Sequence, residues 1–393
     1  MALERLIGVP LQQLEALLAE SWSAFRGVSR YPDVPPPDPS ASLVGEALLD
    51  RSFSLYTSAM VGVPLPETVR RMMQEVVEAR DLFQERGWLE DPAAYHRDPP
   101  PLERYTLSDE TTWSGARRRR YVRLSFESGW EPHPGEPGRE RWLAHPSNGV
   151  AHAYLLEHEE PRPWLVCVHG FGMGSPLVNL SGFAVRRLHD ELGLNLAFPV
   201  LPLHGPRGIG RFSGGEVLNP DYMRMVHLFG QAAWDVRRTV DFLRGRGAER
   251  IGVYGISLGA YVAALVASLQ EGLECVIAGI PAVDFANLAR DNEPWIMRRY
   301  DDEFELDWQV IRQISHPVSP LALSPQVPRE RRFIYAGIAD RVVRPDQPRA
   351  LWRHWAEPEI HWFSGGHVLG VVKSETAKFV ERCLVRSEMA TAS

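Results

Sequence analysis

The chain has few cysteines, no long apolar run and no signal-peptide pattern, and each absence excludes a class of protein. Its three cysteines, Cys167, Cys275 and Cys383, are scattered through 393 residues, so a disulfide framework is not expected. No stretch reaches the roughly 18 uninterrupted apolar residues of a membrane helix. The N-terminus lacks a basic segment followed by a continuous apolar segment, the pattern of a secretory signal. We therefore expect a cytoplasmic protein with no membrane span.

An excess of positive charge is also missing. The net charge is −7 and the isoelectric point is near 6.0, whereas nucleic-acid surfaces need clustered Lys and Arg to displace counterions. We interpret the single basic run, Arg117–Arg120, as the entry to a solvated strand or as local ion-pair partners. The sequence contains no H-E-x-x-H motif or compact set of His and Asp ligands, so we expect no metal and no cofactor.

The first third of the chain has the spacing of amphipathic helices. Apolar residues recur at three- and four-residue steps from Leu11 to Phe25 and again from Leu65 to Phe83, which describes one face of a helix. Residues 1–110 are therefore predicted to form a helical N-terminal extension that acts as a cap or a dimer arm. Residues 111–393 are predicted to form a second domain.

Beyond residue 110 the pattern changes to short strands. Tyr121–Phe126 and Val150–Leu155 are typical of an antiparallel sheet edge. Six later strand-like runs alternate with helical segments: Trp164–Val168, Leu194–Leu201, Arg250–Tyr254, Cys275–Ile280, Arg332–Ala336 and Glu359–Phe363. Runs that are apolar on both faces and separated by helices indicate a parallel sheet covered on both sides. The predicted fold class is therefore α/β.

A G-x-S-x-G motif follows the third of these six strands. Gly255, Ser257 and Gly259 stand between the strand that ends near Tyr254 and a helical run from Ala260 to Leu265. A tight strand-to-helix turn forces the serine into a strained backbone conformation, and the flanking glycines remove Cβ atoms that would clash there. The serine hydroxyl is thereby left exposed as a candidate nucleophile.

An acid and a base follow Ser257 in the order Ser, Asp, His. Asp340 comes directly after the strand Arg332–Ala336, and His367 follows two glycines in a loop after Glu359–Phe363. The imidazole would act as general base, and the carboxylate would hold its tautomer and orientation. Asp284, after the preceding strand, is the competing acid. A further histidine, His204, either lines the pocket or packs within its own loop.

With these residues assembled, the region from about 115 to 386 resembles the α/β-hydrolase superfamily. It looks most like bacterial serine esterases related to dienelactone-hydrolase and acylaminoacyl-peptidase catalytic domains. The segment Pro202–Arg207 and the helix around Gln231–Val236 lie where that branch has a Gly-rich loop and a helix before the nucleophile. The resemblance implies a mostly parallel central sheet with helices on both faces. Dienelactone hydrolases, however, use cysteine where this chain has Ser257.

The resemblance also implies an oxyanion hole and a reaction. The N–H groups of Phe171, in the loop after Trp164–Val168, and of Leu258 would stabilise the tetrahedral oxyanion. Ser257, Asp340 and His367 would form a catalytic triad that cleaves carboxylic esters of small molecules through an acyl-enzyme. An amidase or peptidase with the same triad is an alternative, and so is a non-catalytic interaction module with this fold. The N-terminal helices and an insertion at about 285–328 would cap the pocket, or the helices would form a homodimer interface.

Overall fold

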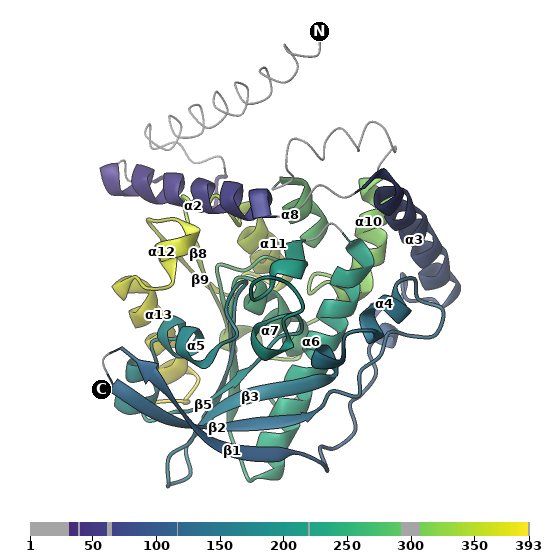
Figure 1. Cartoon of the computed structure of the whole chain (residues 1–393). Coiled ribbons are helices and arrows are strands. Elements are labelled where there is room, and N and C mark those ends of the chain that lie inside the picture. The colour runs from purple at the N-terminus through teal and green to yellow at the C-terminus, as the bar shows by residue number, and fades with distance from the viewer. Residues whose placement is uncertain are drawn as a thin grey trace.

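A computed structural model describes residues 31–37, 40–60, 65–115, 117–218, 221–291 and 307–391. In this part of the chain, nine strands form one sheet in the order β1-β2-β3-β5-β4-β6-β7-β8-β9 (Figure 1). The strands are β1 (Thr106–Ser114), β2 (Arg117–Glu127), β3 (Val150–Leu156), β4 (Trp164–Val168), β5 (Asn195–Pro199), β6 (Ile251–Ile256), β7 (Val276–Gly279), β8 (Arg332–Gly337) and β9 (Glu359–Phe363). The α-helices are α2 (Ala41–Met60), α3 (Pro66–Glu85), α4 (Arg139–Leu143), α5 (Pro176–Gly182), α6 (Tyr222–Gly245), α7 (Leu258–Leu269), α8 (Phe285–Asp291), α10 (Trp308–Ser315), α11 (Asp346–His354), α12 (His367–Gly370) and α13 (Ser374–Arg386).

The strand directions confirm the predicted mostly parallel sheet. The pairs β1–β2, β2–β3 and β3–β5 are antiparallel, and every pair from β5–β4 to β8–β9 is parallel. Each predicted strand run overlaps one strand of the sheet. The edge strand β1 was not expected, because its residues are mostly polar and exposed and carry no apolar alternation.

The basic run Arg117–Arg120 opens β2, and Arg119 pairs with Asp190, as one interpretation of the run predicted.

Helices cover both faces of the sheet. Along β4, Val166 packs in one apolar cluster and Leu165 in another, because successive side chains of a strand point to opposite faces. The first cluster is completed by buried side chains of α3, α6, α7, α10 and α11, and the second by those of α5 and α13. This two-sided burial explains why the central strands are apolar throughout.

The N-terminal region contains one helix that was predicted and one that was not. The helix expected from Leu65 to Phe83 is confirmed as α3, whereas the one expected from Leu11 to Phe25 lies outside the described residues. Helix α2 was missed because the apolar pattern that marks most helices is reversed on it. Its buried residues include the polar side chains of Glu46, Asp50 and Ser54, and its exposed residues include Leu48, Leu49, Leu55 and Tyr56.

Helices α2 and α3 each pack against a helix from the later part of the chain. Figure 1 shows α2 lying beside α12, at the side of the molecule opposite the β1–β2 hairpin. Helix α3 packs against α10, which belongs to the predicted insertion at 285–328. Residues 292–306 of that insertion are outside the described part. Strand β1 crosses residue 110, the expected boundary of the extension, and the division into two domains stays a prediction.

Candidate active site

Ser257 lies in a strained turn between β6 and α7. Its backbone angles are φ 55° and ψ −116°, a region that non-glycine residues rarely adopt. A Cβ atom on Gly255 would lie 2.2 Å from the Gly259 carbonyl oxygen, so the turn closes only because this position carries no side chain. The expected strained turn is therefore present, and Ser257 is half-buried at the end of β6.

The structure brings Ser257, His367 and Asp340 together. The Ser257 hydroxyl donates to Nε2 of His367 over 3.0 Å, and Nδ1 of the same ring is 2.6 Å from Oδ2 of Asp340. Because the carboxylate can only accept, the proton of the neutral imidazole belongs on Nδ1, which leaves Nε2 free to accept from the serine. This arrangement can accept a proton from Ser257 and hold the resulting imidazolium against a carboxylate.

Asp340 is held by hydrogen bonds within its own loop, whereas Asp284 accepts a hydrogen bond at the start of α8. The other oxygen of Asp340 accepts the N–H groups of Val342 and Val343 over 2.9 and 2.7 Å. Asp284, the competing acid, accepts the N–H of Asn287 over 3.0 Å at the start of α8. The bonding pattern therefore couples His367 to Asp340 and gives Asp284 a local role in starting a helix.

The surroundings of His367 favour its protonated form. Burial disfavours the charged ring, but the negative charges of Asp340 and Asp50 and the hydrogen bond to Asp340 outweigh that cost. Together they raise the pKa of His367 above its ordinary value of 6.5. A base with a raised pKa is a stronger proton acceptor, which suits the withdrawal of a proton from a serine hydroxyl.

The predicted oxyanion donors lie on two neighbouring parts of the sheet edge. Val168 at the end of β4 pairs in register with Gly255 of β6, so the loop that carries Phe171 emerges beside the serine turn. A Cβ atom on Gly170 would lie 3.6 Å from Cβ of Ser257, which shows how closely this loop approaches. Leu258 is the first residue of α7, where helix N–H groups have no partner within the helix. A role for the two N–H groups in an oxyanion hole stays a prediction.

Two other histidines of the region have structural contacts. His169 is fully buried, and its Nε2 accepts the N–H of Leu201 over 3.1 Å. Burial lowers the pKa of His169 to about 3 and that of His204 to about 4, so both rings stay neutral at pH 7. Nδ1 of His204 bonds the carbonyl of Pro202 over 2.8 Å within its own loop. His204 was predicted either to line the pocket or to pack within its own loop. Its burial and its contact favour packing within the loop.

Helix α2 supplies residues that the sequence did not indicate. Asp50 accepts the backbone N–H of His367 over 2.6 Å, and Glu46 accepts that of Gly366 over 3.0 Å. On the same helix, Phe53 meets Phe171 edge to face, with ring centroids 6.5 Å apart. Helix α2 therefore contacts both the histidine loop and the predicted oxyanion loop. No sequence motif marked these residues, and the only signal was a pair of carboxylates one helical turn apart.

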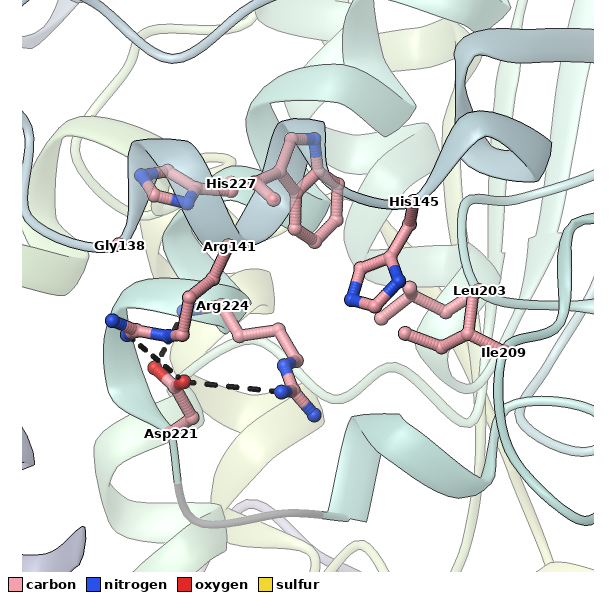
Figure 2. Close-up of a pocket in the computed structure, with 9 residues that line it drawn as sticks. Gly138, Arg141, His145, Leu203, Ile209, Asp221, Arg224 and His227 are labelled. Atoms are coloured by element: carbon pink, nitrogen blue, oxygen red, sulfur yellow. Dashed lines mark hydrogen bonds and ion pairs between the residues drawn. The ribbon is translucent and has the colours of Figure 1, made fainter.

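The structure also has a hollow that none of the proposed catalytic residues lines. It is lined by Gly138, Arg141, Trp142, His145, Leu203, Ile209, Asp221, Arg224 and His227 (Figure 2). Its charged groups pair with one another, because both Arg141 and Arg224 contact Asp221.

Within the described ranges, no cluster of three or more His, Cys, Asp or Glu side chains could hold a metal ion. Nor does any helix in that part of the chain have the length and apolar character required to cross a membrane.

Comparison with known proteins identifies relatives and the fold. No protein-family model matches the chain. Two uncharacterized proteins of Mycobacterium tuberculosis, Rv2627c and MT2702, are each 41% identical over 381 residues, which cover 96% of this chain and 90% of the relative. Acetyl xylan esterase 1 from Thermoanaerobacterium superposes with a TM-score of 0.51 at 15% identity, over 78% of this chain and 93% of that one. The chain therefore belongs to the family of these uncharacterized mycobacterial proteins and has the α/β-hydrolase fold.

Proposed function

We propose that this protein is a serine hydrolase that cleaves carboxylic esters, with Ser257, His367 and Asp340 as its catalytic residues. One observation carries the proposal: a continuous hydrogen-bonded path runs from the Ser257 hydroxyl through the imidazole to the Asp340 carboxylate. The α/β-hydrolase fold hosts many different chemistries, so the fold alone assigns no reaction. The strained turn at Ser257 supports the proposal, because strain of this kind is concentrated at functional sites.

The reaction follows from the arrangement of the three side chains. As the Ser257 oxygen attacks the ester carbonyl carbon, its proton passes to Nε2 of His367, and Asp340 stabilises the imidazolium. The N–H groups of Phe171 and Leu258 would donate to the oxyanion, and one such donor contributes ~3 kcal/mol to the transition state. The imidazolium then protonates the departing alkoxide, which leaves an acyl-serine. Water, deprotonated by His367, releases the acid and restores Ser257.

A fluorophosphonate probe tests the nucleophile directly. The wild-type protein is expected to be labelled, and labelling is expected to be lost in Ser257→Ala and strongly reduced in His367→Ala. Ser181→Ala, which removes an exposed hydroxyl on α5, serves as the control and should be labelled like the wild type. Hydrolysis of p-nitrophenyl esters of increasing chain length would then define the acyl group that the pocket accepts.

The outcomes separate the competing functions. Labelling at Ser257 with cleavage of amides but not of esters would favour the amidase or peptidase alternative, because the same three residues serve both reactions. A folded wild-type protein that takes no probe and cleaves neither class of substrate would contradict the proposal. An interaction module built on the hydrolase fold would then be the better description.

A further inference from the structure

Helix α2 turns two carboxylates toward the loop that carries His367. Glu46 and Asp50 are one turn apart on the buried face of the helix, with exposed fractions of 8% and 1%. Glu46 accepts the N–H of Gly366 and also contacts Nζ of Lys373 over 2.8 Å. Buried carboxylates are costly unless hydrogen bonds or opposite charges compensate them. Apart from the Ser42 hydroxyl on α2, their hydrogen-bond partners lie in the loops of His367 and Asp340 or on Lys373.

Asp50 joins the loop of the base to the loop of the acid. Its carboxylate accepts the N–H of His367 over 2.6 Å, that of Val368 over 3.0 Å and that of Arg341 over 3.1 Å. Arg341 directly follows Asp340, so one side chain holds the backbone at both members of the histidine–aspartate pair. All three contacts are donors to the carboxylate, an arrangement that stabilises its ionised form.

The two glycines before His367 allow this approach. A Cβ atom on Gly366 would lie 2.6 Å from Oδ2 of Asp50, and one on Gly365 would lie 2.7 Å from Oε2 of Glu46. The φ of Gly366 is −95°, which any residue can adopt, so the glycine is not required by the backbone conformation. Gly366 is therefore explained by the close approach of α2, in addition to the loop flexibility that the sequence indicated.

We propose that Asp50 is a positioning residue of the hydrolase, which holds the His367 loop in register with Asp340 and adds a second negative charge behind the imidazole. The kinetic part of this inference depends on the proposed function, whereas the structural part does not. In this arrangement helix α2 completes the active site. The path from Ser257 to Asp340 stays aligned only while α2 is docked on the histidine loop.

The charges around His367 give the proposal a measurable signature. Asp340, after β8, acts on both the His367 ring and Asp50, whereas Glu46, one turn away on α2, is paired with Lys373. Burial and the nearby Asp340 raise the pKa of Asp50 above its ordinary value of 3.8, although the three N–H donors oppose this rise. The charge of Asp50 in turn raises the pKa of His367. Removing that charge should therefore lower the pKa of His367.

Asp50→Asn tests the inference, because it keeps the size of the side chain and removes its charge. With a p-nitrophenyl ester, kcat is expected to fall about 10- to 100-fold while KM changes less than about twofold, as misalignment of a reacting group predicts. The acid limb of the pH profile of kcat/KM should move to lower pH. Ser52→Ala removes an exposed hydroxyl on the same helix and should match the wild type. An unchanged kcat together with an unmoved acid limb would overturn the proposal.

A second measurement does not require activity. In the Ser257→Ala background, an NMR titration of the His367 ring reports its pKa directly, and Asp50→Asn should shift the midpoint to lower pH. A midpoint that stays in place would overturn the part of the proposal that assigns a charge effect to Asp50. If Asp50→Asn fails to fold, Asp50→Glu replaces it, because this change keeps the charge and lengthens the side chain. The His367 pKa should then stay raised while kcat falls, and an unchanged kcat would contradict positioning.

Failure of this inference can be distinguished from failure of the proposed function. A wild-type protein that is not labelled by the fluorophosphonate and cleaves no ester would remove the proposed function but leave the titration informative. An active wild-type protein whose His367 titration and kcat are both insensitive to Asp50→Asn would remove the inference and leave the hydrolase in place.

Discussion

Gly259, at the start of α7, lies so close to Val168, at the end of β4, that an added Cβ atom would be 2.0 Å from the Val168 carbonyl oxygen. The contact is between backbones, so no flexible side chain can move aside. The serine turn and the loop that carries Phe171 are held together by this approach. The second glycine of the G-x-S-x-G motif is therefore required by packing between two elements.

Gly259→Ala is expected to destabilise the fold by about 1–3 kcal/mol, the usual cost of an extra carbon atom in a packed site. Any hydrolysis of esters should also be lost in this variant, because α7 would be displaced beside Ser257. Thermal unfolding and ester hydrolysis measure the two effects. Gly245→Ala is the control, since nothing lies within 4 Å of the added atom. Equal stability of the two variants would contradict the packing argument.

Asp340→Asn should lower kcat by about 10³- to 10⁴-fold, because an amide no longer selects the Nδ1–H tautomer of His367. Asp284→Asn is the matched control at the competing position. It loses a hydrogen bond at the start of α8 and should keep most of the activity. A larger loss of kcat in Asp284→Asn than in Asp340→Asn would reverse the assignment of the acid.

The pH dependence of kcat/KM tests the proposed role of His367 as general base. Because the base must be neutral, activity is lost as the pH falls through its pKa. The pKa is raised above 6.5, so the midpoint of the acid limb is expected above that pH. The measurement is a profile of kcat/KM for a neutral ester across the range from acid to weakly alkaline pH. A midpoint at or below 6.5 would mean that burial outweighs the two carboxylates.

The buried ion pair between Arg207 and Asp235 should be costly to break. Nη1 of Arg207, whose side chain is fully buried, is 2.8 Å from the carboxylate of Asp235, and the guanidinium also donates to the carbonyls of Val200 and Asn148. Arg207→Met would leave the Asp235 charge without its partner, which typically costs about 3–5 kcal/mol. Unfolding in urea measures this free energy.

The surface pair Arg119–Asp190 provides the control for that measurement. Both side chains are partly exposed, so Arg119→Ala should cost less than about 1 kcal/mol. Similar losses in Arg207→Met and Arg119→Ala would show that burial does not amplify the Arg207 pair.

Much of the fold, and the meeting of Ser257, His367 and Asp340, could be predicted, because their signals are local. Strands buried on both faces are apolar throughout, and a strand-to-helix turn with a strained serine needs glycine neighbours. Strand β1 and helix α2 could not be predicted in this way. The first is exposed and polar, and the second buries carboxylates and exposes leucines. A method based on apolar spacing finds no pattern in either segment.

The sequence by itself determined the order of the strands from β2 to β9, the glycine-flanked turn at Ser257 and the set of candidate acids and bases. Only the tertiary structure decided which of them meet. Asp340 and Asp284 both follow strands, yet the hydrogen bond to His367 belongs to Asp340. Asp50 meets His367 across 317 positions of the chain. A contact of this kind depends on how distant elements pack. The sequence near Asp50 and the sequence near His367 contain no local pattern that predicts it.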